Sequence, residues 1–216
     1  EIGVNLFEII QSIKVRKGTH DNIMKPGFGV GGYCLTKDSL LGQWSINNIY
    51  DIDHSLRLTL EALKINFEMP LHTFHRLKNV LRSFRGKTLL ICGISYLADV
   101  GDTRNTPANQ LATAVDKDGG SVVWHDPLID SWDHASRPKK ISGLQDGLQK
   151  ADAVVFCIPQ KEYCQLNIQA LNWAKIRISV WCDTFDIFSD EDAEFLFKRN
   201  IIPVGIGKGH WKKIYE

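Results

Sequence analysis

A cysteine, a lysine and an aspartate follow a glycine-rich run near the start of the chain. The run KPGFGVGGYCLTKD spans residues 25–38 and contains Cys34, Lys37 and Asp38. The thiolate is the reactive form of cysteine, and a nearby lysine and loop amides favour it. On a helical turn, Asp38 would return to the face of Cys34. The pattern predicts covalent chemistry at a carbonyl, although a cysteine alone is more often a small buried hydrophobe.

The other cysteines lack such surroundings. Cys92, Cys157 and Cys182 fall within apolar segments with a strand pattern, where burial should keep them inert. Cys164 has no charged pair arranged around it in the same way. Among the five cysteines, Cys34 is therefore the candidate nucleophile.

The glycines of the run also match a dinucleotide fingerprint, with Gly27, Gly29 and Gly32 at the G-x-G-x-x-G positions. That motif requires a strand directly before it, and residues 22–26, which end in Pro26, do not have a strand pattern. We therefore interpret the run as an irregular loop whose backbone can approach a ligand closely. An ordinary mobile loop is the simpler alternative, but it leaves the residues that follow unexplained.

A second motif, GISYLADVGDTRNTP, spans residues 93–107 between a predicted strand and a predicted helix. In a parallel sheet this position is the carboxyl edge, where ligands bind. Arg104 lies close to the start of the helix and could pair with a phosphate. A surface loop in which Arg104 pairs with Asp99 or Asp102 is the simpler alternative. Asp126, after the next strand, could contact a ribose, although an Asp-Pro pair is more typical of a turn.

The hydrophobic pattern predicts the elements that position these residues. An apolar stripe predicts a long helix over residues 54–84, which Pro70 should kink or divide. From residue 87 onward, short β-branched segments alternate with helical segments, which predicts a parallel sheet covered on both faces. Helix starts are expected at Thr106-Pro107 and at a capping box over residues 189–192. The predicted strands are Thr88–Cys92, Ser121–His125, Ala153–Ile158, Ile178–Cys182 and Ile202–Ile206.

Together the two motifs resemble those of the UDP-glucose/GDP-mannose dehydrogenases, and HDP at residues 125–127 adds to the resemblance. The order of the motifs and the long helix between them also match, so the resemblance covers nearly the whole chain. That family has an NAD-binding Rossmann domain, a helical dimerising middle and a Rossmann-like domain for the nucleotide sugar. The implied fold is α/β: residues 1–84 would be part of the middle with the connecting helix, and residues 85–216 the Rossmann-like nucleotide-sugar-binding domain.

The resemblance also implies an activity: oxidation of the C6 alcohol of a nucleotide sugar to the acid in two NAD-dependent steps. NAD would be bound mainly by a domain outside this chain. Cys34 would trap the aldehyde as a thiohemiacetal and then a thioester. Asp38 would assist proton transfer or position water, and Lys37 would support charged intermediates. Arg104 is assigned to phosphate and cofactor binding. The implied substrate-binding residues are Lys25, Phe28, Gly29, Gly31, Gly32, Tyr33 and Tyr96, with the glycines lining the sugar phosphate through backbone amides.

The chain departs from the family pattern at some positions. Leu97 stands where many members have a lysine, and Gly18 where UDP-glucose enzymes have an arginine, with Arg16 nearby. The expected substrate is UDP-glucose or a UDP-N-acetylhexosamine, and GDP-mannose stays open because residues 25–28 resemble that subgroup's loop. A nucleotide-sugar-binding or dimerisation module without redox activity is the alternative. Asn66 aligns with a recurrent asparagine of the connecting helix, for which a surface polar residue is the simpler account.

The composition bounds these expectations. With 44% hydrophobic and 24% charged residues among 216, the chain is typical of a soluble globular protein of one or two domains. A formal net charge of +1 argues against a nucleic-acid binder, and no segment is apolar for long enough to span a membrane. Scattered cysteines favour a reducing cytoplasm over a disulfide framework, and His72 and His75 lack a third metal ligand. The chain begins with Glu1 inside a helical pattern, which predicts a fragment, and the long apolar face predicts a homodimer or larger oligomer.

Overall fold

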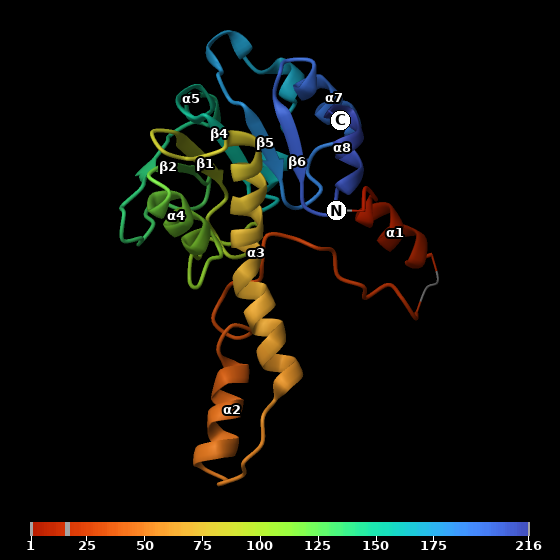
Figure 1. Ribbon diagram of the computed structural model, residues 1–216, viewed down its shortest axis with the longest axis vertical. Helices are drawn as coiled ribbons and strands as arrows, with labels where there is room; N and C mark the ends of the chain where they lie inside the picture. Colours follow the sequence, from red (N-terminus) through yellow and green to blue (C-terminus); the bar gives the residue numbers. More distant parts are fainter. Residues whose placement is uncertain (1, 16–17, 216) are drawn as a thin grey trace.

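The computed structural model describes residues 2–15 and 18–215, which form a six-stranded parallel sheet with helices on both faces (Figure 1). The strand order is β3-β2-β1-β4-β5-β6, and every neighbouring pair is parallel. The predicted Rossmann-like α/β class is therefore confirmed. The strands are β1 (Thr88–Cys92), β2 (Ser121–His125), β3 (Lys139–Lys140), β4 (Ala153–Phe156), β5 (Val180–Asp183) and β6 (Ile202–Gly205).

The helices connect these strands and extend the chain beyond the sheet. They are α1 (Leu6–Ile13), α2 (Asp38–Asn48), α3 (Arg57–Leu81), α4 (Ala108–Lys117), α5 (Leu144–Lys150), α6 (Lys161–Cys164), α7 (Asp190–Phe197) and α8 (Lys212–Tyr215), with single 3-10 turns at Ile168–Ala170, Trp173–Lys175 and Gly209–Trp211. The predicted capping box at the start of α7 is confirmed, since Ser189 and Asp192 bond each other's backbone amides. No helix in the described ranges is both long and apolar enough to cross a membrane.

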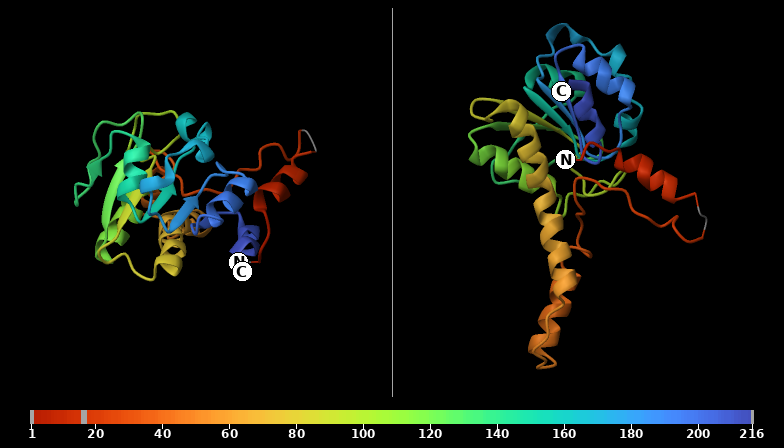
Figure 2. Two further views of the ribbon diagram at one scale, coloured as in Figure 1. Left: turned by 90° about the horizontal axis from the view of Figure 1, so that it is seen from above. Right: turned by 45° about the vertical axis from the view of Figure 1, so that its right-hand side comes forward.

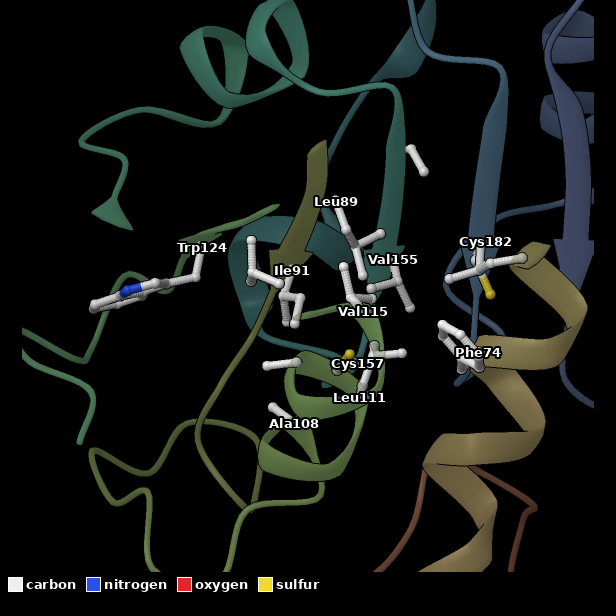
Figure 3. Packing of buried hydrophobic residues seen from close by; sticks show 14 of the residues in the cluster. Phe74, Leu89, Ile91, Ala108, Leu111, Val115, Trp124, Val155, Cys157 and Cys182 are labelled. Carbon is white, nitrogen blue, oxygen red and sulfur yellow. The ribbon is translucent and has the colours of Figure 1, made fainter. Parts of the chain in front are cut away.

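Alternate residues of the strands face two separate cores. Leu89 and Ile91 of β1 pack with α4 and the C-terminal half of α3, as Figure 3 shows. Leu90 and Cys92 pack on the opposite face with α5 and α7. Successive side chains of a strand point to opposite faces, so strands covered on both faces are apolar throughout. This explains why the central strands were recognisable as continuous apolar segments.

Helix α3 continues through Pro70, so the predicted division of this helix does not occur. Its C-terminal half packs on the sheet, where Phe74, Leu77 and Leu81 are buried. Its N-terminal half projects away from the sheet beside α2 (Figure 1, Figure 2). Pro70 has no amide hydrogen, so the helix lacks its usual bond to the carbonyl of Asn66.

Helix α1 docks at the far end of the sheet. The amide of Leu6 donates to the carbonyl oxygen of Gly207 (2.8 Å), and Asn5 forms a β-bridge with Lys208. The segment after α1 then crosses back towards α2 and α3 (Figure 1). The first segment of the chain is therefore in contact with the last strand, and the predicted domain boundary at residues 84–85 stays a prediction.

Candidate functional site

The loop that carries Cys34 docks on the second motif. The amide of Gly32 donates to the carbonyl oxygen of Arg104 at 3.0 Å. In return, the side-chain amide of Asn105 donates to the Gly32 carbonyl oxygen (3.0 Å) and to the Thr36 hydroxyl (3.2 Å). Thr36 is buried, and its hydroxyl donates to the Gly32 carbonyl oxygen at 2.6 Å. These bonds fix the backbone on both sides of Cys34.

The glycines of the loop permit this close docking. A Cβ at Gly31 would lie 2.7 Å from Cβ of Tyr96 and 2.8 Å from the carbonyl oxygen of Asn105. Gly32 has φ +81° and would place a Cβ 3.0 Å from the Tyr96 ring. The loop and the second motif can therefore approach each other only because these residues have no side chain. Since the Gly32 amide is already bonded within the chain, it is not free for the predicted contact with a sugar phosphate.

A second attachment joins the loop to helix α3. The amide of Val30 donates to the side-chain oxygen of Asn66 (2.7 Å), and the side-chain nitrogen of Asn66 donates to the Val30 carbonyl oxygen (2.8 Å). A Cβ at Gly29 would lie 3.5 Å from the Asn66 carbonyl oxygen, the group left without a helical partner by Pro70. Asn66 therefore holds the loop, and the expectation of a simple surface residue was wrong. The signal that could have identified it is its alignment with a recurrent asparagine of the family's connecting helix.

Cys34 opens into a pocket between the two motifs. The pocket has a volume of about 270 Å³ and is lined by Val30, Gly31, Gly32, Tyr33, Cys34, Leu35, Tyr96 and Leu97. Cys34 is an exposed free thiol. The structure thus brings together Cys34 and four of the predicted substrate-binding residues, with aliphatic and aromatic walls around them. Sequence reasoning did not find the aliphatic part of the lining, because Val30 and Leu35 have no chemical pattern of their own.

Lys37 and Asp38 pair with each other at the start of α2. The Lys37 ammonium donates to the Asp38 carboxylate, and both side chains are about half exposed. This hydrogen bond, together with the charges of Asp38 and Cys34, raises the pKa of Lys37 above its ordinary value. The backbone carbonyl of Cys34 accepts from the Asp38 amide at 2.9 Å. The predicted charged pair is therefore next to Cys34, although its two charges largely satisfy each other.

Arg104 is held in a fixed position over the site. Its Nε donates to Asp102 Oδ2 (2.8 Å), and its Nη2 donates to the same carboxylate (2.5 Å). The guanidinium also lies over the Tyr33 ring, 4.1 Å from the ring centroid. The hydrogen bond between Arg104 and Asp102 raises the pKa of the arginine and lowers the pKa of the aspartate. The pairing with Asp102 is the one that the simpler interpretation predicted, and it leaves 61% of the arginine side chain exposed.

Three predicted substrate residues, Lys25, Phe28 and Gly29, do not line this pocket, and Gly29 lies beside Pro107 and Asn66. Phe28 is 1% exposed and belongs to the core cluster that contains Phe74 and Leu77. The buried ring therefore packs in the core, and substrate binding by Phe28 stays a prediction. Lys25 lies 3.8 Å from Asp186 and 5.6 Å from the centroid of the Phe7 ring, near the end of α1. The described contacts of Lys25 are therefore with Asp186 and Phe7, and Lys25 does not line the pocket of Cys34.

The remaining cysteines differ from Cys34 in their surroundings. Cys92, Cys157 and Cys182 are at most 1% exposed, and burial raises the pKa of each thiol. Their predicted burial is confirmed. Cys164 is exposed, but partial burial raises the pKa of its thiol as well. A raised pKa lowers the fraction of reactive thiolate at neutral pH.

Comparisons with known proteins match both parts of the chain. The central domain of the UDP-glucose/GDP-mannose dehydrogenase family matches residues 1–68, and the UDP binding domain of the same family matches residues 90–190. The UDP-N-acetyl-D-mannosamine dehydrogenase of Methanocaldococcus jannaschii is 27% identical over 88% of this chain and 42% of its own length. The NDP-N-acetyl-D-galactosaminuronic acid dehydrogenase of Ralstonia nicotianae is 29% identical over 79% of this chain and 39% of its own length. The chain therefore spans less than half the length of these relatives.

Solved structures have the same fold. The NDP-N-acetyl-D-galactosaminuronic acid dehydrogenase of Methanosarcina mazei Go1 gives a TM-score of 0.84 at 24% identity, over 98% of this chain and 45% of that one. The UDP-D-ManNAc dehydrogenase of Pyrococcus horikoshii gives a TM-score of 0.78 at 24% identity, over 96% of this chain and 45% of that one.

Proposed function

Because the chain belongs to the UDP-glucose/GDP-mannose dehydrogenase family, we propose that it supplies the catalytic cysteine and part of the sugar site of a nucleotide-sugar dehydrogenase. The observation that supports this most directly is the pocket between the two motifs, into which Cys34 opens. The proposed substrate is UDP-glucose or a UDP-N-acetylhexosamine. Relatives named for N-acetylated sugars favour the second.

In the proposed chemistry, the sulfur of Cys34 adds to the C6 aldehyde carbon of the sugar and a proton reaches the carbonyl oxygen. The thiohemiacetal holds the aldehyde, and hydrolysis of the later thioester releases the acid. Lys37 can stabilise the oxyanion and Asp38 can transfer a proton or orient water, once substrate separates their mutual bond. Arg104, with part of its guanidinium exposed beside Tyr33, is proposed to bind phosphate.

The dehydrogenases of this family use NAD, and we assign the oxidation steps to that cofactor. The sheet of this chain does not fit NAD, because the Asp126 carboxylate already bonds the backbone amides that follow β1. Cofactor binding is therefore proposed for another part of the complete protein, and a fragment with only these residues should not reduce NAD.

Gly18 lies in an exposed turn, and Arg16 lies outside the described residues.

A homodimer or larger oligomer stays part of the proposal. The arm formed by α2 and the N-terminal half of α3 exposes Trp44 (56%), Leu58 (86%) and Phe67 (42%). Exposed apolar residues of this density are typical of surfaces that another part of a protein or a second copy covers. A cytoplasmic location, expected from the cysteines, also stays a proposal.

The alternative function is binding without catalysis. The specific observation in its favour is that Leu97 lines the pocket, while Lys37 and Arg104 are each paired with a carboxylate. Equilibrium binding of a UDP-sugar together with an unreactive Cys34 would support this alternative.

Competition between alkylation and substrate tests the proposal. Iodoacetamide should modify Cys34 before Cys164, because the pKa of the Cys164 thiol is raised. A UDP-N-acetylhexosamine or UDP-glucose should slow modification of Cys34 and leave Cys164 unaffected, as peptide mass spectrometry would show. Equal modification of both thiols, without protection by either sugar nucleotide, would overturn the proposal.

A further inference from the structure

The sheet has the strand order of dinucleotide-binding folds, 3-2-1-4-5-6. In such folds a pyrophosphate binds backbone amides directly after β1, and an acidic residue at the end of β2 binds the ribose. This chain has both components: Gly93, with φ +86°, follows β1, and Asp126 follows β2 by one residue. The difference lies in the direction of the Asp126 side chain.

The Asp126 carboxylate bonds the amides at which a phosphate would be expected. Its Oδ2 accepts from the amides of Ile94 (2.8 Å) and Ser95 (3.1 Å), and its Oδ1 accepts from the amide of Leu128 (2.9 Å). The side chain is 1% exposed. Successive amides in such a turn form a concave site for an anion. An anion that belongs to the chain already fills this one.

Gln160, in the loop after β4, also occupies the space next to the amides that follow β1. Its side-chain nitrogen donates to the Ser95 hydroxyl (2.9 Å) and to Asp126 Oδ1 (3.3 Å). Its side-chain oxygen accepts from the Asp99 amide (2.7 Å), and the residue is 1% exposed. A Cβ at Gly93 would lie 2.9 Å from Cβ of Ile158, so the backbones leave no gap here. A ligand phosphate could enter only by displacing a buried carboxylate and leaving it without partners, which is costly.

We propose that Asp126 is an internal anion that occupies the phosphate position of this Rossmann-like domain and excludes dinucleotides from it. Asp126 thereby determines specificity: the domain keeps the dinucleotide strand order, and phosphate-bearing ligands are left with the pocket of Cys34. The inference depends on the fold and on these hydrogen bonds, and it stands even if the proposed dehydrogenase activity fails.

The test is a residue-specific titration of the isotope-labelled chain, followed by the amide resonances of Ile94 and Ser95. In the wild-type chain, neither millimolar pyrophosphate nor NAD should shift these two resonances. In Asp126→Ala, pyrophosphate should shift both in a saturable manner, because the amides have lost their acceptor. Asp126→Asn keeps the shape and one acceptor oxygen, which can still accept from the amides of Ile94 and Ser95, so these two resonances should not shift in this variant either.

Far-UV circular dichroism establishes that each variant is folded. A saturable shift of Ile94 and Ser95 with NAD in the wild-type chain would overturn the proposal. A folded Asp126→Ala chain whose two resonances ignore pyrophosphate would also overturn it. Should the alanine variant not fold, the wild-type and Asp126→Asn titrations decide: unmoved amides support occupation of the phosphate position by the side chain of residue 126, and shifted amides contradict it.

Discussion

Replacing Gly31 with alanine should separate the loop of Cys34 from the motif against which it docks. The added Cβ would lie 2.7 Å from Cβ of Tyr96 and 2.8 Å from the Asn105 carbonyl oxygen. Carbon atoms pack best at about 3.5–4.0 Å, so the two segments would have to separate by roughly 1 Å. Both neighbouring atoms are in or next to the backbone, and neither can turn aside as the end of a flexible side chain could.

Overpacking of this kind costs about 1–3 kcal/mol. If the cost falls on the docked loop, affinity for a UDP-sugar should decrease by about 5- to 150-fold, since about 1.4 kcal/mol corresponds to a factor of ten. Calorimetric titration measures that change directly. Gly143→Ala is a suitable control, because a Cβ there meets no atom within 4 Å and its φ of −141° suits any residue. An affinity of Gly31→Ala within about twofold of that control would refute the role assigned to this close contact, since about 1 kcal/mol already predicts a larger change.

Three further predictions concern single contacts. Arg104→Ala should weaken UDP-sugar binding by about 1–3 kcal/mol in calorimetry if the guanidinium binds phosphate, whereas Arg177→Ala, remote from the pocket of Cys34, should not. Asn66→Ala removes two hydrogen bonds from the loop, each of about 0.5–1.5 kcal/mol, so Cys34 should be alkylated faster than in the exposed helix-surface control Glu68→Ala. Asp118 accepts hydrogen bonds from the Lys78 ammonium and the Phe84 amide, and these bonds lower its pKa. Its contribution to stability is therefore present above the unfolded pKa of about 3.9 and is lost as pH falls through the lower folded value. Asp118→Asn should therefore flatten the decline in urea-unfolding free energy below about pH 4, and an unchanged pH profile would contradict that assignment.

The central strands were predictable because burial on both faces makes them continuously apolar. The bounds of β1 and β2 agree with the prediction, while the third predicted strand, Ala153–Ile158, extends two residues beyond the end of β4. Those two residues are buried without continuing the strand, and an apolar pattern reports burial rather than pairing. Strand β3 was missed because Lys139-Lys140 is an edge strand whose only marker is its pairing with Val123 and Trp124.

The proximity of the candidate residues was predictable from the sequence, but the geometry of the loop only in part. The types and spacing of Cys34, Lys37 and Asp38 indicated a reactive loop, and the structure keeps them adjacent. The docking of the loop depends on contacts between distant segments, such as Gly32 with Arg104 and Val30 with Asn66, which no local pattern reports. The burial of Phe28 was not predicted for a related reason, because an aromatic residue in a glycine-rich loop can serve a ligand or the core equally well.

The same limit applied to Pro70 and Asp126. Local propensity predicted a kink or a division at Pro70, and the division does not occur because the following turns pack on the sheet. An Asp-Pro pair after a strand predicted a turn. The structure shows in addition that the Asp126 carboxylate is buried and bonds the turn after β1, which is a property of the tertiary structure alone.

The central claim is that Cys34 carries the covalent chemistry of the complete protein. Product analysis of the complete protein with a UDP-sugar and NAD tests it most directly, comparing wild type, Cys34→Ala and the matched variant Cys164→Ala. We predict that Cys34→Ala forms no uronic acid, while Cys164→Ala forms it at the wild-type rate. Formation of uronic acid by Cys34→Ala at the wild-type rate would contradict the claim.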